Sequence, residues 1–142
     1  MDAGASPLLP EAVETQPRNV KLLSMTLNIE EIARAFSGHR FDEAADYVAD
    51  DVTLALVGAE PLTGKDAVLE ATAATTRDLA DARIDFRQFD TIVGSDAVVI
   101  DAVASYTEAN GNVSTVASCD IYRFANGMIA SVRSYNIELP AD

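Results

Sequence analysis

Residues 97–137, AVVIDAVASYTEANGNVSTVASCDIYRFANGMIASVRSYNI, decide the fold. Two Asn-Gly dipeptides, Asn110-Gly111 and Asn126-Gly127, separate three runs rich in β-branched and other apolar residues. Two-residue hairpin turns favour Asn-Gly, because both central residues of a type I′ turn need a positive φ. The segment therefore predicts an antiparallel meander of three strands, at Ala97–Tyr106, Val113–Phe124 and Met128–Ile137.

The length of the first turn fixes which residues of the meander lie opposite each other. If Asn110-Gly111 forms a two-residue turn, Asp101 lies as many positions before it as Asp120 lies after it, so the two face each other. Two carboxylates at this distance cannot both be charged cheaply in a dry site. A buried pair would hold one proton and act as a donor beside an acceptor. An exposed pair would be two ordinary surface carboxylates without a catalytic role.

The residues before the meander predict helices first and a further strand later. Asn28 followed by Glu31 resembles a capping box, and apolar residues then recur with helical spacing until Gly38. The other predicted elements are a second helix capped by Asp42 that ends before Asp50, a strand at Val52–Val57, a third helix opened by Thr63 and Asp66, and a strand at Arg83–Val93.

This order of elements indicates an α+β fold, with a curved antiparallel sheet covered by the N-terminal helices. The chain has 142 residues, of which 49% are apolar, which is enough for one core. We expect residues 1–27 to form a flexible N-terminal leader and residues 28–142 to form a single domain.

Charge and cysteine content exclude several classes of partner. The chain carries 23 acidic and 10 basic residues, and its net charge of -13 disfavours nucleic acid and membrane surfaces. The single cysteine, Cys119, cannot form an internal disulfide, which suits a cytoplasmic protein. We find no metal-ligand spacing and no glycine-rich phosphate loop, so we expect no metal and no cofactor.

Three stretches carry a resemblance to a known family. They are Ala49-Asp50-Asp51-Val52-Thr53, Gly64-Lys65-Asp66-Ala67-Val68, and Asp120-Ile121-Tyr122-Arg123-Phe124 running into Asn126-Gly127-Met128-Ile129. Over Asn28 to Leu139 the chain resembles the nuclear-transport-factor-2-like superfamily, which includes SnoaL-like polyketide cyclases, ketosteroid isomerases and limonene epoxide hydrolases. The resemblance implies a cystatin-like α+β barrel with a conical, mostly apolar pocket for a small molecule.

The catalytic residues of two of these families match the chain only in part. The resemblance to ketosteroid isomerases places their protonated aspartate at Asp120, but their tyrosine falls near Ile32 and their base near Ala55 or Leu56. That mechanism is therefore not expected here. The resemblance to limonene epoxide hydrolases places a strand aspartate close to Asp101, but their arginine falls at Val99 and their last aspartate at Ser134.

The turn at Asn126-Gly127 leaves two arrangements open for the last strand. A strict two-residue turn places Arg133 opposite Asp120 and forms a cluster with Asp101. A one-residue bulge at Gly127 instead turns Ser134 and Asn136 inward and Arg133 outward.

We interpret the protein as a small cofactor-free enzyme of the cyclase, epoxide hydrolase or isomerase type, with Asp120 and Asp101 as its catalytic acid–base pair. An apolar natural-product-like molecule is its expected ligand. The candidate ligand-binding residues are Tyr47, Ser105, Ser118, Tyr122, Arg133, Ser134 and Asn136.

A second interpretation assigns no catalysis to the fold. The strand face opposite to Asp101 and Asp120, which carries Val98, Ile100 and Cys119, is the more continuously apolar one. If that face is the core, the two aspartates lie on a solvated or dimer-facing surface. The protein would then be a dimeric binding or interaction module. In both interpretations we expect a homodimer, and we interpret His39 as a surface residue near a helix end.

Overall fold

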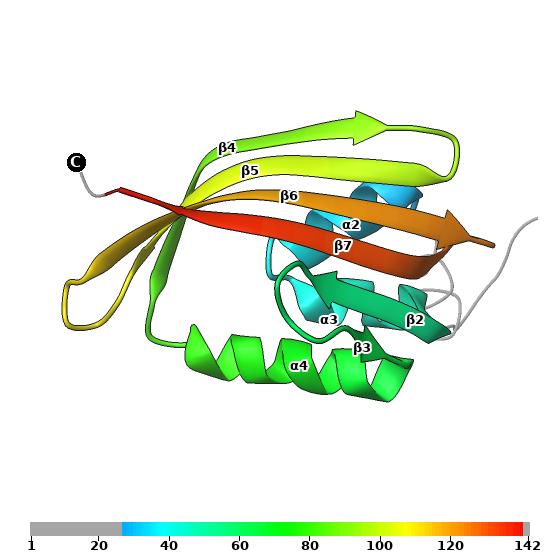
Figure 1. The fold of residues 1–142 in the computed structure, drawn as a ribbon, viewed down its shortest axis with the longest axis horizontal. Helices are drawn as coiled ribbons and strands as arrows, with labels where there is room; N and C mark the ends of the chain where they lie inside the picture. Colours follow the sequence, from blue (N-terminus) through cyan, green and yellow to red (C-terminus); the bar gives the residue numbers. More distant parts are fainter. Residues whose placement is uncertain (1–26, 141–142) are drawn as a thin grey trace, which may run out of the picture.

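The computed structural model describes residues 27–140 and contains three helices, a short 3-10 turn and six strands (Figure 1). Nearly all of the expected N-terminal leader lies outside the described residues. The elements in chain order are α2 (Ile29–Ser37), α3 (Phe41–Ala44), η2 (Ala45–Tyr47), β2 (Val48–Leu56), β3 (Leu62–Thr63), α4 (Lys65–Asp78), β4 (Arg83–Val93), β5 (Ala97–Thr107), β6 (Val113–Ala125) and β7 (Met128–Leu139).

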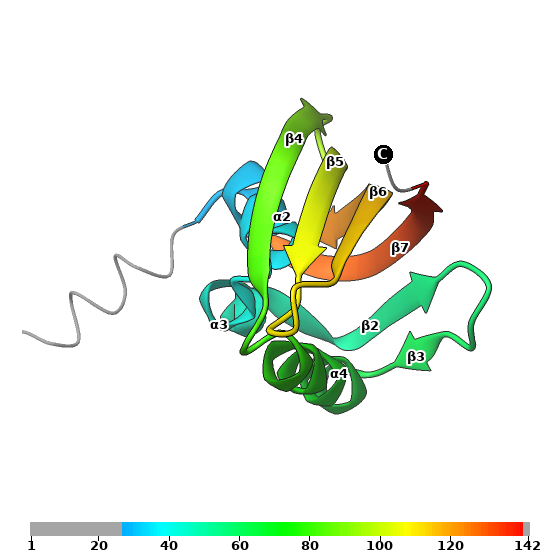
Figure 2. The same cartoon turned by 90° about the vertical axis from the view of Figure 1, so that its left-hand side faces the viewer.

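The six strands form one curved sheet in the order β3-β2-β7-β6-β5-β4. It is mixed, because β2 pairs with β7 in parallel while every other pair is antiparallel. Viewed from the end, the sheet bends around α2 and α3, and α4 lies below them (Figure 2). The predicted α+β architecture, with its curved sheet and a helix-covered inner face, is confirmed. The prediction of an antiparallel sheet is wrong for one pair, because β2 lies parallel to β7.

Helix α2 begins and ends where the sequence predicts. The Asn28 side chain accepts a hydrogen bond from the backbone N–H of Glu31, whose carboxylate accepts one from the backbone N–H of Asn28. This capping box satisfies two N–H groups that have no partner inside the helix. Gly38 is the C-terminal cap.

The second predicted helix is wrong in its length and its cap. Helix α3 ends at Ala44, and the extended strand β2 begins at Val48. Asp42 lies inside the helix, and the cap residue Arg40 makes no side-chain capping bond. Val48 and Val52 are buried in β2, and Val48 pairs with β7. Burial and pairing of β-branched residues therefore prevail over the helical spacing of this segment.

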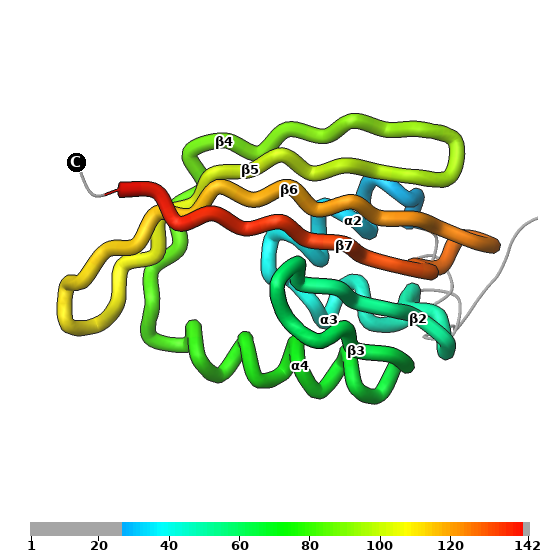
Figure 3. The backbone as a smooth tube through the Cα atoms, viewed as in Figure 1, coloured from blue at the N-terminus to red at the C-terminus, as the bar shows by residue number. Residues whose placement is uncertain are grey.

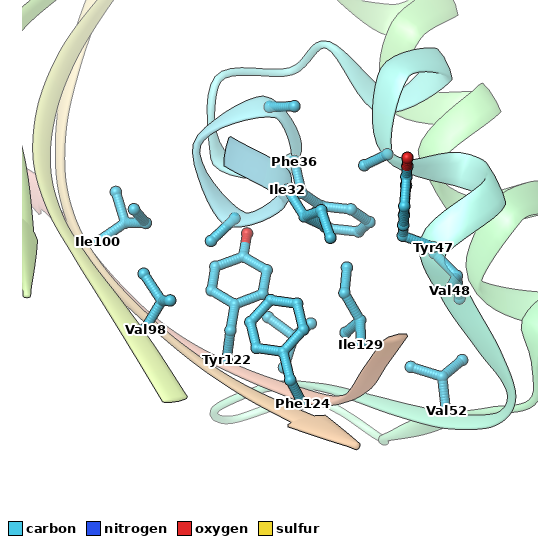
Figure 4. Packing of buried hydrophobic residues seen from close by; sticks show 14 of the residues in the cluster. Ile32, Phe36, Tyr47, Val48, Val52, Val98, Ile100, Tyr122, Phe124 and Ile129 are labelled. Carbon is cyan, nitrogen blue, oxygen red and sulfur yellow. The ribbon is translucent and has the colours of Figure 1, made fainter. Parts of the chain in front are cut away.

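The core lies between the inner face of the sheet and helices α2 and α3. Figure 4 shows Ile32 and Phe36 of α2 packed over Tyr122, Phe124 and Ile129 of the sheet. Fully buried side chains extend this cluster across β5 and β2 and include Val98, Ile100 and Val52. Within residues 27–140, no helix has the length and apolar character needed to cross a membrane.

The turn at Asn110-Gly111 differs from the predicted one by one residue. Thr107 pairs with Val113, the Gly111 N–H donates to the Glu108 carbonyl, and the Glu108 N–H donates to the Asn112 carbonyl. The loop therefore has three residues, and Gly111 takes a positive φ of 91°. This is the three-residue hairpin in which a type I turn is followed by a left-handed residue.

The extra residue moves Asp101 to the other face of the sheet. Asp101 pairs with Cys119, and Asp120 pairs with Ile100, so the predicted pairing of Asp101 with Asp120 is wrong. Because side chains of neighbouring strand positions point to opposite faces, a shift of one residue separates the two carboxylates. The hairpin that carries this loop bends away from the plane of the other strands (Figure 3).

The second Asn-Gly turn has the predicted two residues, and a bulge follows it. Asn126 and Gly127 have φ values of 55° and 76°, and Ala125 pairs with Met128. Phe124 then pairs with Ile129 but Arg123 pairs with Ser131, which leaves Ala130 as the extra residue. Of the two arrangements left open, the inward Ser134 and Asn136 are therefore observed, although the bulge lies at Ala130 instead of Gly127. This sets Ser134 opposite Asp120.

Candidate active site

The inner face of the sheet and the helices line an open cavity of about 210 Å³. Its polar lining comes mainly from β6 and β7 and from the end of α2, and it includes Ser37, Ser118, Asp120, Tyr122, Ser134 and Asn136, together with His39, Tyr106 and two threonines of α4, Thr72 and Thr75. The opposite lining is apolar and comes mostly from Phe36, Phe41, Leu54, Leu56, Leu62 and Phe86. Since few polar groups converge in an otherwise apolar cavity, this is the form expected of a small-molecule site.

Asp120 is the acidic residue of this cavity, and each of its oxygens accepts a hydrogen bond from a hydroxyl group. Ser37 Oγ donates to Oδ2 at 2.7 Å, and Ser134 Oγ donates to Oδ1 at 2.5 Å. The two serines come from segments far apart in the chain, the end of α2 and the last strand. The carboxyl group is therefore held in one orientation from both sides.

Both serines are themselves held by a further donor. Asn136 Nδ2 donates to Ser134 Oγ at 2.9 Å. Ser37 Oγ lies 2.6 Å from the Tyr122 hydroxyl. Because the Ser37 hydroxyl already donates its one hydrogen bond to Asp120, Tyr122 is the donor in this contact. Figure 4 shows the Tyr122 hydroxyl directed toward α2. Complete burial, and then the charge of Asp120, raise the pKa of Tyr122 well above its ordinary value, so the phenol keeps its proton.

A second polar group in the cavity consists of His39 and Tyr106, which are joined by a hydrogen bond. His39 Nε2 and the Tyr106 hydroxyl lie 3.0 Å apart, and both residues line the cavity. Burial lowers the pKa of His39, although the charge of Asp120 partly opposes this. Burial and the same charge raise the pKa of Tyr106. Both side chains are therefore neutral near pH 7.

Aromatic rings surround this second group. The His39 ring centroid lies 5.7 Å from that of Phe41 and 6.1 Å from that of Phe86. Phe86 is 38% exposed although it lines the cavity. An exposed ring at this place offers contact area to a flat apolar ligand.

Five of the nine site residues predicted from the sequence lie together in the cavity. They are Asp120, Ser118, Tyr122, Ser134 and Asn136.

The other four lie elsewhere. Asp101 is exposed on the outer face, pairs with Asp90 across β4 and β5, and accepts a hydrogen bond from Gln88. Arg133 is exposed, because the bulge at Ala130 turns it outward. Ser105 is buried against Thr115, and Tyr47 is buried in the core with its hydroxyl accepting from the Leu27 N–H. The cluster of Asp101, Asp120 and Arg133 is therefore not formed.

Three residues of the site were missed by the sequence interpretation. Ser37 and Tyr106 carried no recognisable motif, and His39 was interpreted as a surface residue. The predicted end of the first helix at Gly38 could have drawn attention to them, because a helix that covers the sheet brings the residues around its end to the sheet. Cys119 lies on the outer face, and burial, followed by the charges of Asp120 and Asp101, raises its pKa, so it is a poor thiolate nucleophile.

The arrangement suits proton transfer. A carboxyl group fixed by two hydroxyl groups in an apolar cavity can take a proton from a bound molecule and return it at another position. Among residues 27–140, no cluster of three or more His, Cys, Asp or Glu side chains could hold a metal ion.

The model of one protein family matches most of the described chain. It is the SnoaL-like domain, and the match covers residues 29–132. No curated protein matches the chain.

Solved structures show the same fold in other proteins. An NTF2-like protein of unknown function from Cytophaga hutchinsonii is 27% identical over 76% of this chain and 95% of its own, with a TM-score of 0.68. A putative isomerase from Rhodopseudomonas palustris is 24% identical over 74% of this chain and 82% of its own, with a TM-score of 0.57. An LEH-like epoxide hydrolase from M. tuberculosis is 15% identical over 77% of this chain and 79% of its own, with a TM-score of 0.58.

Proposed function

Because the chain belongs to the SnoaL-like domain family, we propose that it is a small enzyme in which Asp120 performs acid–base chemistry on an apolar small molecule. The observation that carries this proposal is the Asp120 carboxyl group, held in the cavity by hydrogen bonds from Ser37 and Ser134. No second carboxyl group is needed, since a single one can accept a proton and return it.

The size and lining of the cavity limit the ligand. An apolar cavity of about 150 Å³ is known to bind benzene, so a cavity of about 210 Å³ takes a substituted ring or a molecule of similar size. The apolar wall favours a neutral compound, because a charged one would lose its hydration without an opposite charge on that wall. Proteins of this fold are named as an isomerase, a polyketide cyclase and an epoxide hydrolase. These names supply the three reaction classes to be tested.

The test measures the turnover of three small substrates by variants of two aspartates of the sheet, Asp120 and Asp101. The substrates are limonene 1,2-epoxide for ring opening, 3-cyclohexenone for isomerisation and 2,6-heptanedione for intramolecular cyclisation. With the compound that is converted, Asp120→Asn is expected to lower kcat roughly 10²- to 10⁴-fold, the usual contribution of a general acid or base. Asp101→Asn, the same substitution on the outer face, is expected to leave kcat unchanged.

Equal rates for the two variants would refute the role of Asp120. Binding of these compounds without conversion of any would instead support the non-catalytic binding module.

We further propose that the protein acts in the cytoplasm as a homodimer that pairs through the outer face of the sheet. Ile137 is 65% exposed and Tyr135 is 40% exposed on β7, and Ile92 is 66% exposed on β4. Half-buried apolar residues, Val99, Val103 and Ile121, lie between these two strands on the same face. A second copy would remove this apolar surface from water.

A further inference from the structure

His39 occupies a backbone position that normally belongs to glycine. Its N–H donates to the Phe36 carbonyl and the Arg40 N–H donates to the Ala35 carbonyl, which is the Schellman arrangement at the end of α2. In this arrangement the residue after the cap is left-handed, and His39 has a φ of 63°. Gly38, one residue earlier, has an ordinary φ of -85°. The chain therefore keeps an imidazole where glycine would be less strained, which points to a role for the side chain.

The hydrogen-bond partners of His39 select its tautomer. Nδ1 is buried without a hydrogen-bond partner, whereas Nε2 is bonded to Tyr106. If Tyr106 donated to Nε2, the proton of the neutral ring would lie on Nδ1 and leave a buried N–H without an acceptor. A buried N–H without an acceptor is rarer than a buried acceptor without a donor. The proton therefore belongs on Nε2, and His39 donates to the Tyr106 oxygen.

This direction leaves the Tyr106 proton free for a ligand. The hydroxyl oxygen accepts from His39, so its O–H can point to a different acceptor. No other hydrogen bond holds this hydroxyl among the described residues, and Tyr106 lines the cavity. Burial raises the pKa of the phenol, which keeps it a donor at neutral pH.

We propose that Tyr106, positioned by His39, is the oxygen-binding group of the cavity and that the ligand is a flat, neutral carbonyl compound. The carbonyl oxygen accepts the Tyr106 proton in a hydrogen bond, and the rings of Phe41 and Phe86 contact the flat part of the ligand.

This inference rests on the proposed function only for its chemical consequence. When Asp120 removes a proton from the carbon next to the carbonyl, the C–H electron pair moves toward the carbonyl carbon and the oxygen gains negative charge. The hydrogen bond from Tyr106 becomes stronger as this charge develops. Binding of the carbonyl group itself requires no turnover and can be tested alone.

The test uses two compounds of nearly the same shape, 2-acetylnaphthalene and 2-isopropenylnaphthalene, which differ in having a carbonyl oxygen or a CH₂ group. We expect the wild-type protein to bind the ketone about tenfold more tightly, the ratio that one hydrogen bond of ordinary net strength provides. Tyr106→Phe is expected to abolish this preference by weakening ketone binding alone. Tyr135→Phe, the same substitution on the outer face, is expected to retain it.

His39 is tested as a positioning residue by His39→Asn, because asparagine tolerates the left-handed backbone. At about pH 7.5 this variant is expected to remain as stable as the wild type and to lose part of the ketone preference. His39 is also the only histidine of the chain, so its ring signals in NMR are unambiguous. Their carbon and nitrogen shifts should show the Nε2–H tautomer, and ketone binding should move them.

Three results would overturn the inference. They are equal affinities for the two compounds in the wild type, a ketone preference that survives Tyr106→Phe, and an Nδ1–H tautomer. Failure of both compounds to bind would overturn the ligand class. If Asp120→Asn leaves turnover unchanged while the wild type still prefers the ketone, the proposed enzymatic function is refuted and this inference stands.

Discussion

The inner and outer faces of the sheet present two aspartates in very different surroundings. On the inner face Asp120 lies in a cavity and accepts hydrogen bonds from Ser37 and Ser134. On the outer face Asp101 is exposed, and one amide of Gln88 bonds both Asp101 and Asp90. Both aspartates belong to neighbouring strands of one sheet, β5 and β6. Only Asp120 lies on the face that the helices cover, and this cover makes its carboxyl group a candidate for catalysis.

The largest expected difference between the faces concerns stability. Ile100 is fully buried on the inner face, and Ile100→Ala should lower the free energy of unfolding by about 3 to 4 kcal/mol, because it removes buried methyl groups and leaves a cavity. Ile137→Ala on the outer face should cost below about 1 kcal/mol in the monomer. Urea unfolding at low protein concentration measures both. Similar losses would mean that the inner face is not the core.

The next expected effect concerns assembly. Ile137→Asp introduces a charge into the exposed apolar face, and burying that charge against a second copy would be costly. We expect this variant to weaken the homodimer at least 100-fold in sedimentation equilibrium while the monomer keeps its unfolding free energy. Asp101→Asn is the matched control that removes a charge from the same face. A monomeric wild-type protein at micromolar concentrations would refute the dimer.

A smaller effect concerns the pH dependence of stability. Burial lowers the pKa of His39, so the unfolded chain binds a proton more readily than the folded one. His39 should therefore contribute stability above about pH 6.5 that is lost as the pH falls toward its folded pKa, with a slope of at most about 1.4 kcal/mol per pH unit.

Comparison with a variant isolates this contribution. In His39→Asn the difference in unfolding free energy from the wild type should shift with pH between about 7.5 and 5, a window on both sides of the ordinary histidine pKa. Because His39 is the only residue that differs between the two proteins, the pH-dependent part of this difference reports the desolvation of the imidazole. A pH-independent difference would show that His39 is not desolvated in the folded state.

The sequence predicts most of the fold, because its strands and turns depend on local signals. Strand β4 has the predicted ends, β5 to β7 differ from prediction only by one or two residues at their C-terminal ends, and α2 has the predicted cap. The resemblance to the superfamily predicted a pocket between helices and sheet, and the structure has a cavity there. The short α3 was not predicted, since pairing of β2 with β7 is a contact distant in sequence.

The site was predicted only in part, because it depends on register. The loop at Gly111 and the bulge at Ala130 each add one residue that local patterns do not reveal. The first places Asp101 outside, and the second places Ser134 beside Asp120. Ser37 and His39 reach the cavity only through the packing of α2 on the sheet.

The smallest expected effect tests the turn that separates the two aspartates. Gly111 has a φ of 91° and open space where a Cβ would lie, so Gly111→Ala should cost only the strain of the left-handed backbone, about 1 kcal/mol. Gly94, in the preceding turn, has no positive φ, and Gly94→Ala should change the stability by less than about 0.5 kcal/mol. Thermal unfolding measures both. Equal effects would mean that Gly111 does not hold the three-residue loop, and the separation of Asp101 from Asp120 would then depend on the pairing of β5 with β6 alone.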